Sequence, residues 1–481
     1  MTGIVDGARL LAQMTGYNPW WVGKPQRLPS FRRVAFHRCL ERLTDSRSRR
    51  AVLLSGPRRV GKSTILNQIA QELIAQGNDP KSILYLSLDD NLLKLAALPE
   101  LLEIFHESIL PEGQSAYLLL DEVHFSTDWD SHLKTFIDHR PEYRILATGS
   151  ASIEHRQRTA DSGVGRWVTI SIPTLSFYEY LRLIERAPGG IDTKLKASDL
   201  HRASAGTRAL LASTMRATLP SFKRYLLTGG FPETAKITDV AECQRLIRED
   251  IVDKVLKRDV TALFGVRLVA DLERLFLYVC LHSGGIVNAS TCASELGLSR
   301  STVDDHLDIL VRSNLLYRVG PFARGGKKIL KARYKYYLVD AALRNAILLS
   351  GEAVLQDVNE MGRVVETAVL RHLFAFHYRD LPTISYWLDS RTKKEVDIIV
   401  QHPSYTIPVE VKYRDSANVE ANSGLAIFCA EEKVRRAFMV TRRDVDFDIV
   451  QPTGSSLTVL RIPAHIFTYL VGQAEQHQTS R

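Results

Sequence analysis

A glycine-bracketed stretch near the N-terminus constrains this chain more than any other feature. Residues 56–63 read G-P-R-R-V-G-K-S, and they follow an apolar run at residues 51–55 and precede a helical pattern at residues 65–70. Gly56 and Gly61 let the loop curl so that its backbone N–H groups point inward, and the following helix presents its positive N-terminal end to the phosphates. A strand, a loop of this spacing and a helix are typical of a phosphate-binding loop.

The residues of this loop predict a site for ATP and Mg²⁺. The ammonium group of Lys62 is expected to reach the β- and γ-phosphates, and the Ser63 hydroxyl is expected to ligate the magnesium ion. A Gly/Lys-rich surface turn is the alternative. The predicted nucleotide-binding residues are Gly56, Pro57, Arg58, Arg59, Val60, Gly61, Lys62, Ser63 and Thr64.

An acidic pair ends one of the later apolar runs. Strand-like and helix-like runs alternate downstream of the loop, which predicts a parallel sheet covered by helices on both faces. Asp121 and Glu122 follow the run at residues 117–120. Because open α/β sheets bind ligands at the carboxyl ends of their strands, Asp121 is expected to hold magnesium through its water shell. Glu122 is expected to orient and deprotonate the attacking water, with an ordinary acidic turn as the alternative.

Two further features of this region predict contacts with the reacting phosphate. Thr148 or Ser150, at the tip of the next strand, can bond the γ-phosphate or the attacking water, and a simple turn explains each equally well. Arg156, Arg158 and Arg166 follow. Arg166 is our first choice for an arginine that stabilises transition-state charge, in the same chain or across a subunit boundary.

The middle of the chain predicts a helix-turn-helix. Residues 289–310 have its spacing, with Gly297 in the turn and Ser299 capping the second helix. Strands at residues 315–319 and 334–338 are expected to form a wing.

These elements make DNA a predicted partner, through the second helix and the tip of the wing. The acidic side chains on that helix would repel the DNA backbone, so a winged helix used only for protein packing stays open. The expected DNA contacts are Arg300, Ser301, Thr302, Lys327, Lys328 and Lys331, and the acidic side chains are Asp304, Asp305 and Asp308.

A second group of carboxylates lies in the last third of the chain. Glu366 falls on the apolar face of a helical pattern, and a buried carboxylate needs a cation, a metal or a hydrogen-bond donor. Asp397 lies on one predicted strand, and Glu410 and Lys412 share a face of the next one.

This D–x12–E-V-K pattern resembles the PD-(D/E)xK nucleases. The resemblance implies that Asp397 and Glu410 bind magnesium, that Lys412 helps to position or activate water, and that Glu366 completes the acidic cluster. A strand pair whose charges only face water, or a nuclease fold without activity, are the alternatives.

Several motifs together resemble the AAA-type ATPases of bacteria and archaea that carry a C-terminal winged-helix and nuclease-like module. The resemblance covers about residues 18 to 415. It implies an α/β fold class: a P-loop NTPase with a RecA/AAA-like parallel sheet, a winged helix-turn-helix and an α/β restriction-endonuclease-like domain. The motifs that carry it are the phosphate loop, the Asp121–Glu122 pair and residues 18–21, 148–150, 175–181 and 229–233.

The length of 481 residues suits about three domains of ordinary size. The predicted order is an N-terminal arm (1–50), a P-loop ATPase domain (51–220), a helical and winged-helix domain (221–345), a nuclease-like domain (346–470) and a flexible tail (471–481). In the arm, Trp20 and Trp21 favour a hydrophobic anchor over a platform for stacked bases.

Composition narrows the partners and the cellular setting. The net charge of +9 favours an anionic partner. The five cysteines show no C-x-x-C spacing, so neither disulfides nor zinc are indicated. Without a signal sequence or a long apolar window, we expect a cytoplasmic protein with no membrane partner.

The expected function is a magnesium-dependent ATPase acting on DNA, with ATP hydrolysis coupled to a nuclease-like domain that cleaves or binds DNA. The alternative is an ATP-driven regulatory switch, or a ring-shaped homo-oligomeric DNA motor in which Arg166 acts across subunits. In both alternatives the nuclease-like domain only binds.

Overall fold

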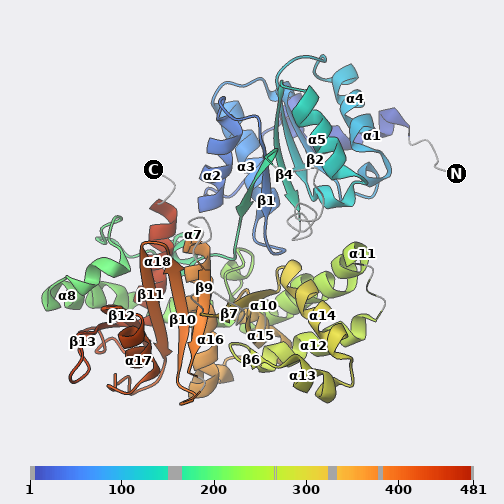
Figure 1. Ribbon diagram of the computed structural model, residues 1–481. Helices are drawn as coiled ribbons and strands as arrows, with labels where there is room; N and C mark the ends of the chain where they lie inside the picture. The colour runs from blue at the N-terminus through green and yellow to red at the C-terminus, as the bar shows by residue number, and fades with distance from the viewer. Residues whose placement is uncertain are drawn as a thin grey trace. The chain divides into compact units, whose positions relative to one another are not determined.

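A five-stranded parallel sheet organises the first of the two units of the chain, Met1–Ile172 and Pro173–Arg481 (Figure 1). The computed structural model describes residues 6–149, 165–264, 266, 268–322, 333–377, 383–389 and 391–477. The strand order is β2-β3-β4-β1-β5, and this confirms the predicted α/β fold with a parallel sheet. The strands are β1 (Ala51–Ser55), β2 (Ile83–Ser87), β3 (Ala116–Asp121), β4 (Tyr143–Gly149) and β5 (Trp167–Ser171).

Helices cover both faces of this sheet, because strands such as β1 and β2 are apolar and buried throughout. Figure 1 shows α2 and α3 against one face and α4 and α5 against the other. In α4 the buried positions Leu98, Leu101, Leu102 and Phe105 recur at helical spacing and form one apolar stripe. The helices are α1 (Gly7–Tyr17), α2 (Val34–Thr44), α3 (Lys62–Ala75), α4 (Leu98–Ser108) and α5 (Trp129–His139).

The N-terminal arm closes the edge of the sheet at β2. The indole nitrogens of Trp20 and Trp21 both donate to the Ile83 carbonyl, at 3.0 and 2.9 Å. The Asn18 amide donates to the Tyr85 carbonyl and accepts from the Tyr85 N–H, at 2.8 and 2.7 Å. The side chain of Asn18 therefore pairs with β2 as another strand would, and the anchoring role expected for the tryptophans is confirmed.

A nine-stranded mixed sheet organises the second unit, in the order β13-β14-β12-β11-β10-β9-β7-β8-β6. The strands expected for a wing join the strands of the last predicted domain, since β7 pairs with β9 through Gly320–Ser385 and Pro321–Tyr386. The expected boundary near residue 345 therefore falls inside one continuous sheet. The strands are β6 (Ile286–Val287), β7 (Leu316–Pro321), β8 (Tyr334–Leu338), β9 (Thr383–Leu388), β10 (Glu395–His402), β11 (Tyr405–Lys412), β12 (Arg436–Thr441), β13 (Ile449–Val450) and β14 (Thr458–Pro463).

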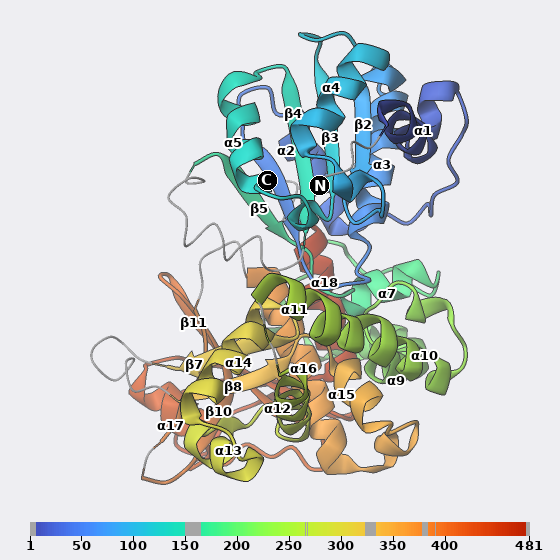
Figure 2. The same cartoon turned by 90° about the vertical axis from the view of Figure 1, so that its right-hand side faces the viewer.

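The helices of the second unit cover this sheet and extend beyond it. Figure 2 shows α12, α13 and α14 grouped beside β7 and β8. The charged stretch at residues 245–264 is helical, and most of it winds as π-helix at Ile247–Asp253 and Val255–Asp259. The α-helices are α7 (Phe177–Leu183), α8 (Ala205–Met215), α9 (Leu219–Thr228), α10 (Val240–Leu246), α11 (Val260–Phe264), α12 (Val269–Leu281), α13 (Ala289–Leu296), α14 (Arg300–Arg312), α15 (Ala341–Leu348), α16 (Val358–His377), α17 (Gly424–Glu431) and α18 (Ala464–His477).

The segment from Pro173 to about residue 220 belongs to the second unit, although the sequence groups it with the ATPase domain. A capping box of Ser176 and Glu179 starts α7. The Phe177 N–H then donates to Nε2 of His372 on α16, at 2.8 Å. Burial lowers the pKa of His372 well below its usual value, so the neutral ring accepts this bond.

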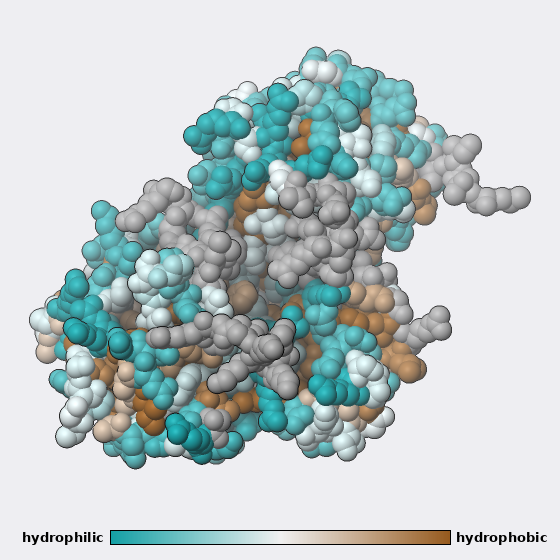
Figure 3. All heavy atoms as spheres, in the orientation of Figure 1, coloured by the Kyte–Doolittle hydropathy of each residue, from teal (hydrophilic) through white to brown (hydrophobic). Residues whose placement is uncertain are grey.

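The surface is mostly hydrophilic on the face shown in Figure 3, and its apolar side chains are scattered over it. None of the helices in the described part of the chain combines the length and the apolar composition that crossing a bilayer requires.

Candidate functional site

The loop between β1 and α3 has the backbone of a phosphate-binding turn. Gly61 is the N-cap of α3 at φ 95°, a left-handed conformation that glycine adopts readily. Gly56 approaches the next segment closely: a Cβ atom there would lie 2.1 Å from the Ile172 carbonyl oxygen. Both glycines of the predicted motif therefore have a geometric reason, and the N-terminus of α3 is directed at the loop.

Lys62 crosses the inside of this loop. Its side chain is buried, and Nζ donates to the carbonyls of Gly56 and Pro57, both at 3.0 Å. The ammonium group thus lies among the loop residues, where the β- and γ-phosphates of a nucleotide would be held. Arg33 supports the loop from outside, because its guanidinium donates to the Val60 carbonyl at 2.9 Å.

Asp121, at the end of β3, is buried and accepts hydrogen bonds from several side chains. Tyr85 donates to Oδ2 at 2.9 Å, and Thr148, at the end of β4, donates to Oδ1. Burial raises the pKa of Asp121 and the neighbouring Glu122 raises it further, while bonds from Ser63, Thr148 and Tyr85 act in the opposite direction. Ser63 and Thr148 therefore both lie beside Asp121, and the roles of Ser63 and Asp121 in holding magnesium stay a prediction.

Glu122 starts the turn after β3 in the left-handed region, at φ 50°. Its N–H donates to the Thr148 hydroxyl at 3.0 Å, and its Oε2 lies 3.4 Å from Nδ1 of His124. The Thr148 hydroxyl therefore links the two residues of the acidic pair. The Glu122 carboxylate remains partly exposed, as a group that activates water must be.

The four residues predicted from the D–x12–E-V-K pattern come from three elements of the second unit. Asp397 on β10 accepts from the Val411 N–H at 2.8 Å. Lys412 forms an ion pair with Glu410 on β11. Glu366 on α16 accepts from the Tyr337 hydroxyl at 2.6 Å.

The charges of this carboxylate cluster interact strongly. Burial, and then the charge of Asp397, raise the pKa of Glu366 and of Glu410 to about 8 in each case. Burial raises the pKa of Asp397 as well. Three carboxylates that cannot all ionise easily are therefore held within electrostatic reach of one another.

A second lysine enters the cluster from β8 and was not foreseen. The Lys335 side chain is only 3% exposed, and Nζ lies 3.5 Å from the Glu395 carboxylate. Glu366 and Asp397 raise its pKa against the opposing effect of burial. Little in the sequence indicated this role. Lys335 lies on β8, and β8 comes near the cluster only because its neighbour β7 pairs with β9.

Both candidate metal sites offer the oxygen ligands that magnesium prefers. Ser63 and Asp121 supply a hydroxyl and a carboxylate, and Asp397 and Glu410 supply two carboxylates. Within the described residues, no three side chains of the His, Cys, Asp or Glu types lie close enough together to hold a metal by themselves. A magnesium ion that keeps several waters fits such incomplete protein shells.

The helix pair α13–α14 follows the predicted pattern. Gly297 adopts φ 68° between the helices, and the Ser299 hydroxyl accepts from the Thr302 N–H at 3.1 Å. Asp308 is paired with Arg312, at 2.6 Å. The basic residues Lys327, Lys328 and Lys331 lie outside the described residues.

A comparison with protein families supports the type of domain that carries the first site. Residues 48–181 match the family model described as an AAA domain. These residues form an AAA-type P-loop ATPase domain. Residues 219–375 and 361–464 match two further family models, each described as a domain of unknown function (DUF8612 and DUF4143).

Two uncharacterized proteins resemble the chain beyond the AAA domain. One, from Haemophilus influenzae, is 24% identical over 381 residues, which are 78% of this chain and 85% of that protein. The other, from Methanocaldococcus jannaschii, is 24% identical over 354 residues, or 72% of each.

Solved structures are similar only at a low level. A Thermotoga maritima RuvB Holliday junction branch migration motor is 18% identical, with 62% of this chain and 91% of that chain covered and a TM-score of 0.28. Saccharomyces cerevisiae Hsp104 in complex with casein is 16% identical, with 63% and 53% covered and a TM-score of 0.31. Scores this low establish no shared overall fold.

Arg166, which was predicted to contact the reacting phosphate, is not brought to the phosphate loop of the AAA domain. Ser150 lies outside the described residues. Arg166 bonds both carboxylate oxygens of Asp138, at 2.9 and 3.1 Å, and its carbonyl accepts from Ala51 at the start of β1. It therefore lies at the opposite end of the strands from the loop, and a role across a subunit boundary stays a prediction.

The sequence did not reveal three supporting residues of the AAA domain: Arg33, Tyr85 and His124. Tyr85 lies in the middle of β2, beside β3, and its place in a strand-like run was its only signal. His124 stands two positions after Glu122, so the spacing of the two could have suggested a pair. Arg33 reaches the loop from the N-cap position of α2, and no local pattern predicts that contact.

Proposed function

We propose that this protein is a magnesium-dependent ATPase, and that ATP hydrolysis in its first unit controls what the second unit does on DNA. The observation that carries the proposal is the convergence of Lys62, Ser63, Asp121 and Glu122 at the carboxyl ends of β1 and β3, in a domain that matches an AAA family model. The net charge of +9 and the helix pair α13–α14 support DNA as the partner.

In this proposal the loop N–H groups and Lys62 hold the phosphates, and Ser63 and Asp121 hold the magnesium ion that enters with the nucleotide. That ion would neutralise charge on the phosphate oxygens. Glu122 orients a water in line with the γ-phosphorus and takes its proton as the bond to ADP breaks. The Thr148 hydroxyl bonds the Asp121 carboxylate and the Glu122 N–H, and so holds these two residues in position.

The test is ATP hydrolysis by purified protein, with ATP binding followed in parallel by calorimetry. Lys62→Ala should abolish both, whereas Glu122→Gln should keep binding and slow hydrolysis by about 100-fold or more. Lys81→Ala, a lysine exposed on the same unit, is the matched control. Normal hydrolysis by Lys62→Ala would refute the proposal.

The carboxylate cluster supports a second candidate function, metal-dependent cleavage of DNA. Its support is the arrangement of Glu366, Asp397, Glu410, Lys335 and Lys412, which brings three carboxylates and two ammonium groups together. In this mechanism Asp397 and Glu410 hold magnesium, and Lys412 orients the water that attacks the phosphodiester.

Linear, circular, single-stranded and branched DNA should be incubated with the protein, with and without ATP, magnesium or manganese. Cleavage that is lost in Asp397→Ala and kept in Asp389→Ala, a partly exposed aspartate after β9, supports the nuclease. ATP hydrolysis with every DNA form intact would instead favour a regulatory switch whose last domain only binds.

A further inference from the structure

A cavity of 440 Å³ in the second unit lies apart from the carboxylate cluster. Its walls are mostly apolar and come from α16, α18 and strands β11 and β12. Phe376, Phe438, Phe467 and Leu470 are among its apolar lining residues. A volume in this range suits a small organic ligand, and pockets of that kind combine apolar walls with a few polar groups.

His201 is a polar residue in the lining of this cavity, and its ring nitrogens have unused hydrogen-bonding capacity. Both of its ring nitrogens are buried and have no hydrogen-bond partner among the described residues. The ring packs edge-on against Phe438, with centroids 4.9 Å apart. Burial, and then the charges of Arg436 and Arg208, lower the pKa of His201 to about 4. The ring is therefore neutral near pH 7 and presents one donor and one acceptor.

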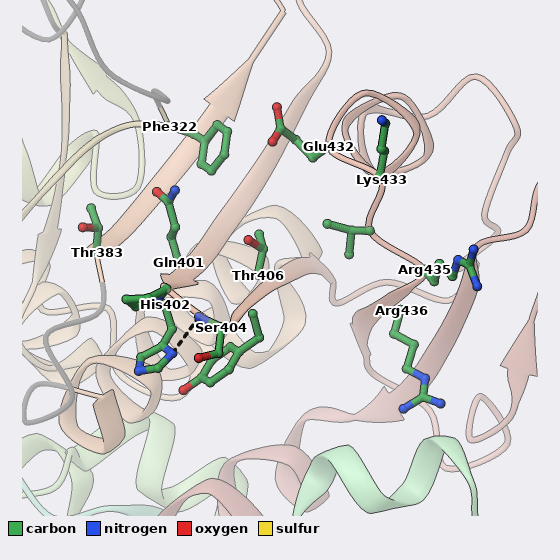
Figure 4. A pocket seen from close by; sticks show the side chains of 13 residues that line it. Phe322, Thr383, Gln401, His402, Ser404, Thr406, Glu432, Lys433, Arg435 and Arg436 are labelled. Atoms are coloured by element: carbon green, nitrogen blue, oxygen red, sulfur yellow. Dashed lines mark hydrogen bonds between the residues drawn. The ribbon is translucent and has the colours of Figure 1, made fainter.

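Arg436 gives the cavity a positive rim. Its exposed side chain lines the cavity, as does Lys196. Arg436 also lines a neighbouring cleft of 920 Å³, and Figure 4 shows it projecting in a different direction from Arg435. Within the described residues, Arg436 has no carboxylate in ion-pair range, so its guanidinium is available to an anion.

We propose that this cavity binds a small heteroaromatic anion, and that a nucleoside monophosphate has the matching parts. A flat ring would lie among the phenylalanines, its polar edge would bond His201, and its phosphate would face Arg436. A fatty acyl anion would satisfy the apolar walls and Arg436 but would leave both nitrogens of His201 unpaired. This site goes beyond the ATPase proposed above and does not depend on it.

The experiment is calorimetry on full-length Lys62→Ala protein, which removes the binding contribution of the phosphate loop. The probes are AMP, GMP, CMP and UMP, with inorganic phosphate and decanoate as comparison ligands. We expect at least one nucleoside monophosphate to bind more tightly than either comparison ligand. The proposal is overturned if no nucleotide binds at about 1 mM, or if decanoate binds as tightly.

Two variants assign the binding to this cavity. Arg436→Gln and His201→Phe should each weaken it by about tenfold. Arg435→Gln is the matched control, because Arg435 lines only the neighbouring cleft. The affinity of this variant for the nucleotide should stay within about twofold of the unsubstituted value. Thermal unfolding of each variant checks that the fold is intact. Equal losses in Arg435→Gln and Arg436→Gln, or no loss in His201→Phe, would contradict the proposal.

Discussion

At the scale of single residues, Thr148 has the most direct consequence for ATP hydrolysis. Its hydroxyl donates to Asp121 and accepts from the Glu122 N–H, so one oxygen positions both members of the acidic pair. Thr148→Val keeps the shape and removes both bonds. We expect kcat to fall by about 10- to 100-fold with little change in the Kd for ATP.

Thr148→Ser provides the matched control, since it keeps the hydroxyl and loses only a methyl group. Single-turnover hydrolysis separates the chemical step from binding. If Thr148→Val hydrolysed ATP normally, the bridging role assigned to the hydroxyl would be wrong.

Glu366 predicts an unusual dependence of stability on pH. Its pKa in the folded chain is about 8, above the ordinary value of 4.5, so the folded state binds this proton more tightly than the unfolded state does. The free energy of unfolding therefore falls as pH rises through the window between these values, and it levels off above about pH 8. Glu366→Gln should flatten part of this slope.

Urea unfolding at about pH 5, 7 and 9 measures the slope, and Glu431→Gln, at an exposed position on α17, is the control. A slope equally steep in Glu366→Gln and in the native chain would show that another group carries the effect.

Lys335 compensates the charge of the same cluster. Lys335→Met leaves Glu366 and Asp397 with less positive charge nearby, and breaking such a buried arrangement costs about 3 kcal/mol. Magnesium should restore more stability to this variant than to the native chain, because a cation can replace the lost ammonium group. Thermal unfolding with and without magnesium tests this, and Lys335→Arg should behave like the native chain.

At the scale of elements, the N-terminal arm stabilises the sheet through β2. Asn18 is fully buried, and its side chain bonds the N–H and the carbonyl of Tyr85 as well as the carbonyl of Met14. Asn18→Ala leaves a buried N–H and a buried carbonyl without partners, which should lower the free energy of unfolding by about 2 kcal/mol. Asn91→Ala, at an exposed position, should change it by less than about 0.5 kcal/mol. Chemical denaturation of the native chain and of these two variants measures the difference.

At the scale of the whole molecule, the continuous nine-stranded sheet sets where the chain can be divided. Residues 173–481 keep that sheet intact and should fold on their own, with a cooperative thermal transition. A fragment starting at residue 346 removes β6, β7 and β8 and exposes the edge of β9, so it should aggregate. Circular dichroism and gel filtration of the two fragments test this difference.

The AAA domain shows how far local pattern leads. The spacing from Gly56 to Ser63, the carboxylates after an apolar run and the alternation of strands and helices predicted the parallel sheet and the position of its site. Arg166 shows where that reasoning stops. Arg166 was preferred because it comes just before a predicted strand, but that strand, β5, runs parallel to β1, so the residue before it lies at the end of the sheet away from the phosphate loop.

The sequence by itself determined the phosphate loop, the acidic pair and the alternation of the carboxylate strands, because each depends on neighbours within a few residues. Only the tertiary structure decided that β7 pairs with β9, that Lys335 joins Glu366 and Asp397, and that residues from Pro173 on belong to the second unit. These contacts join segments far apart in the chain, and burial and long-range hydrogen bonding select them without leaving a local pattern.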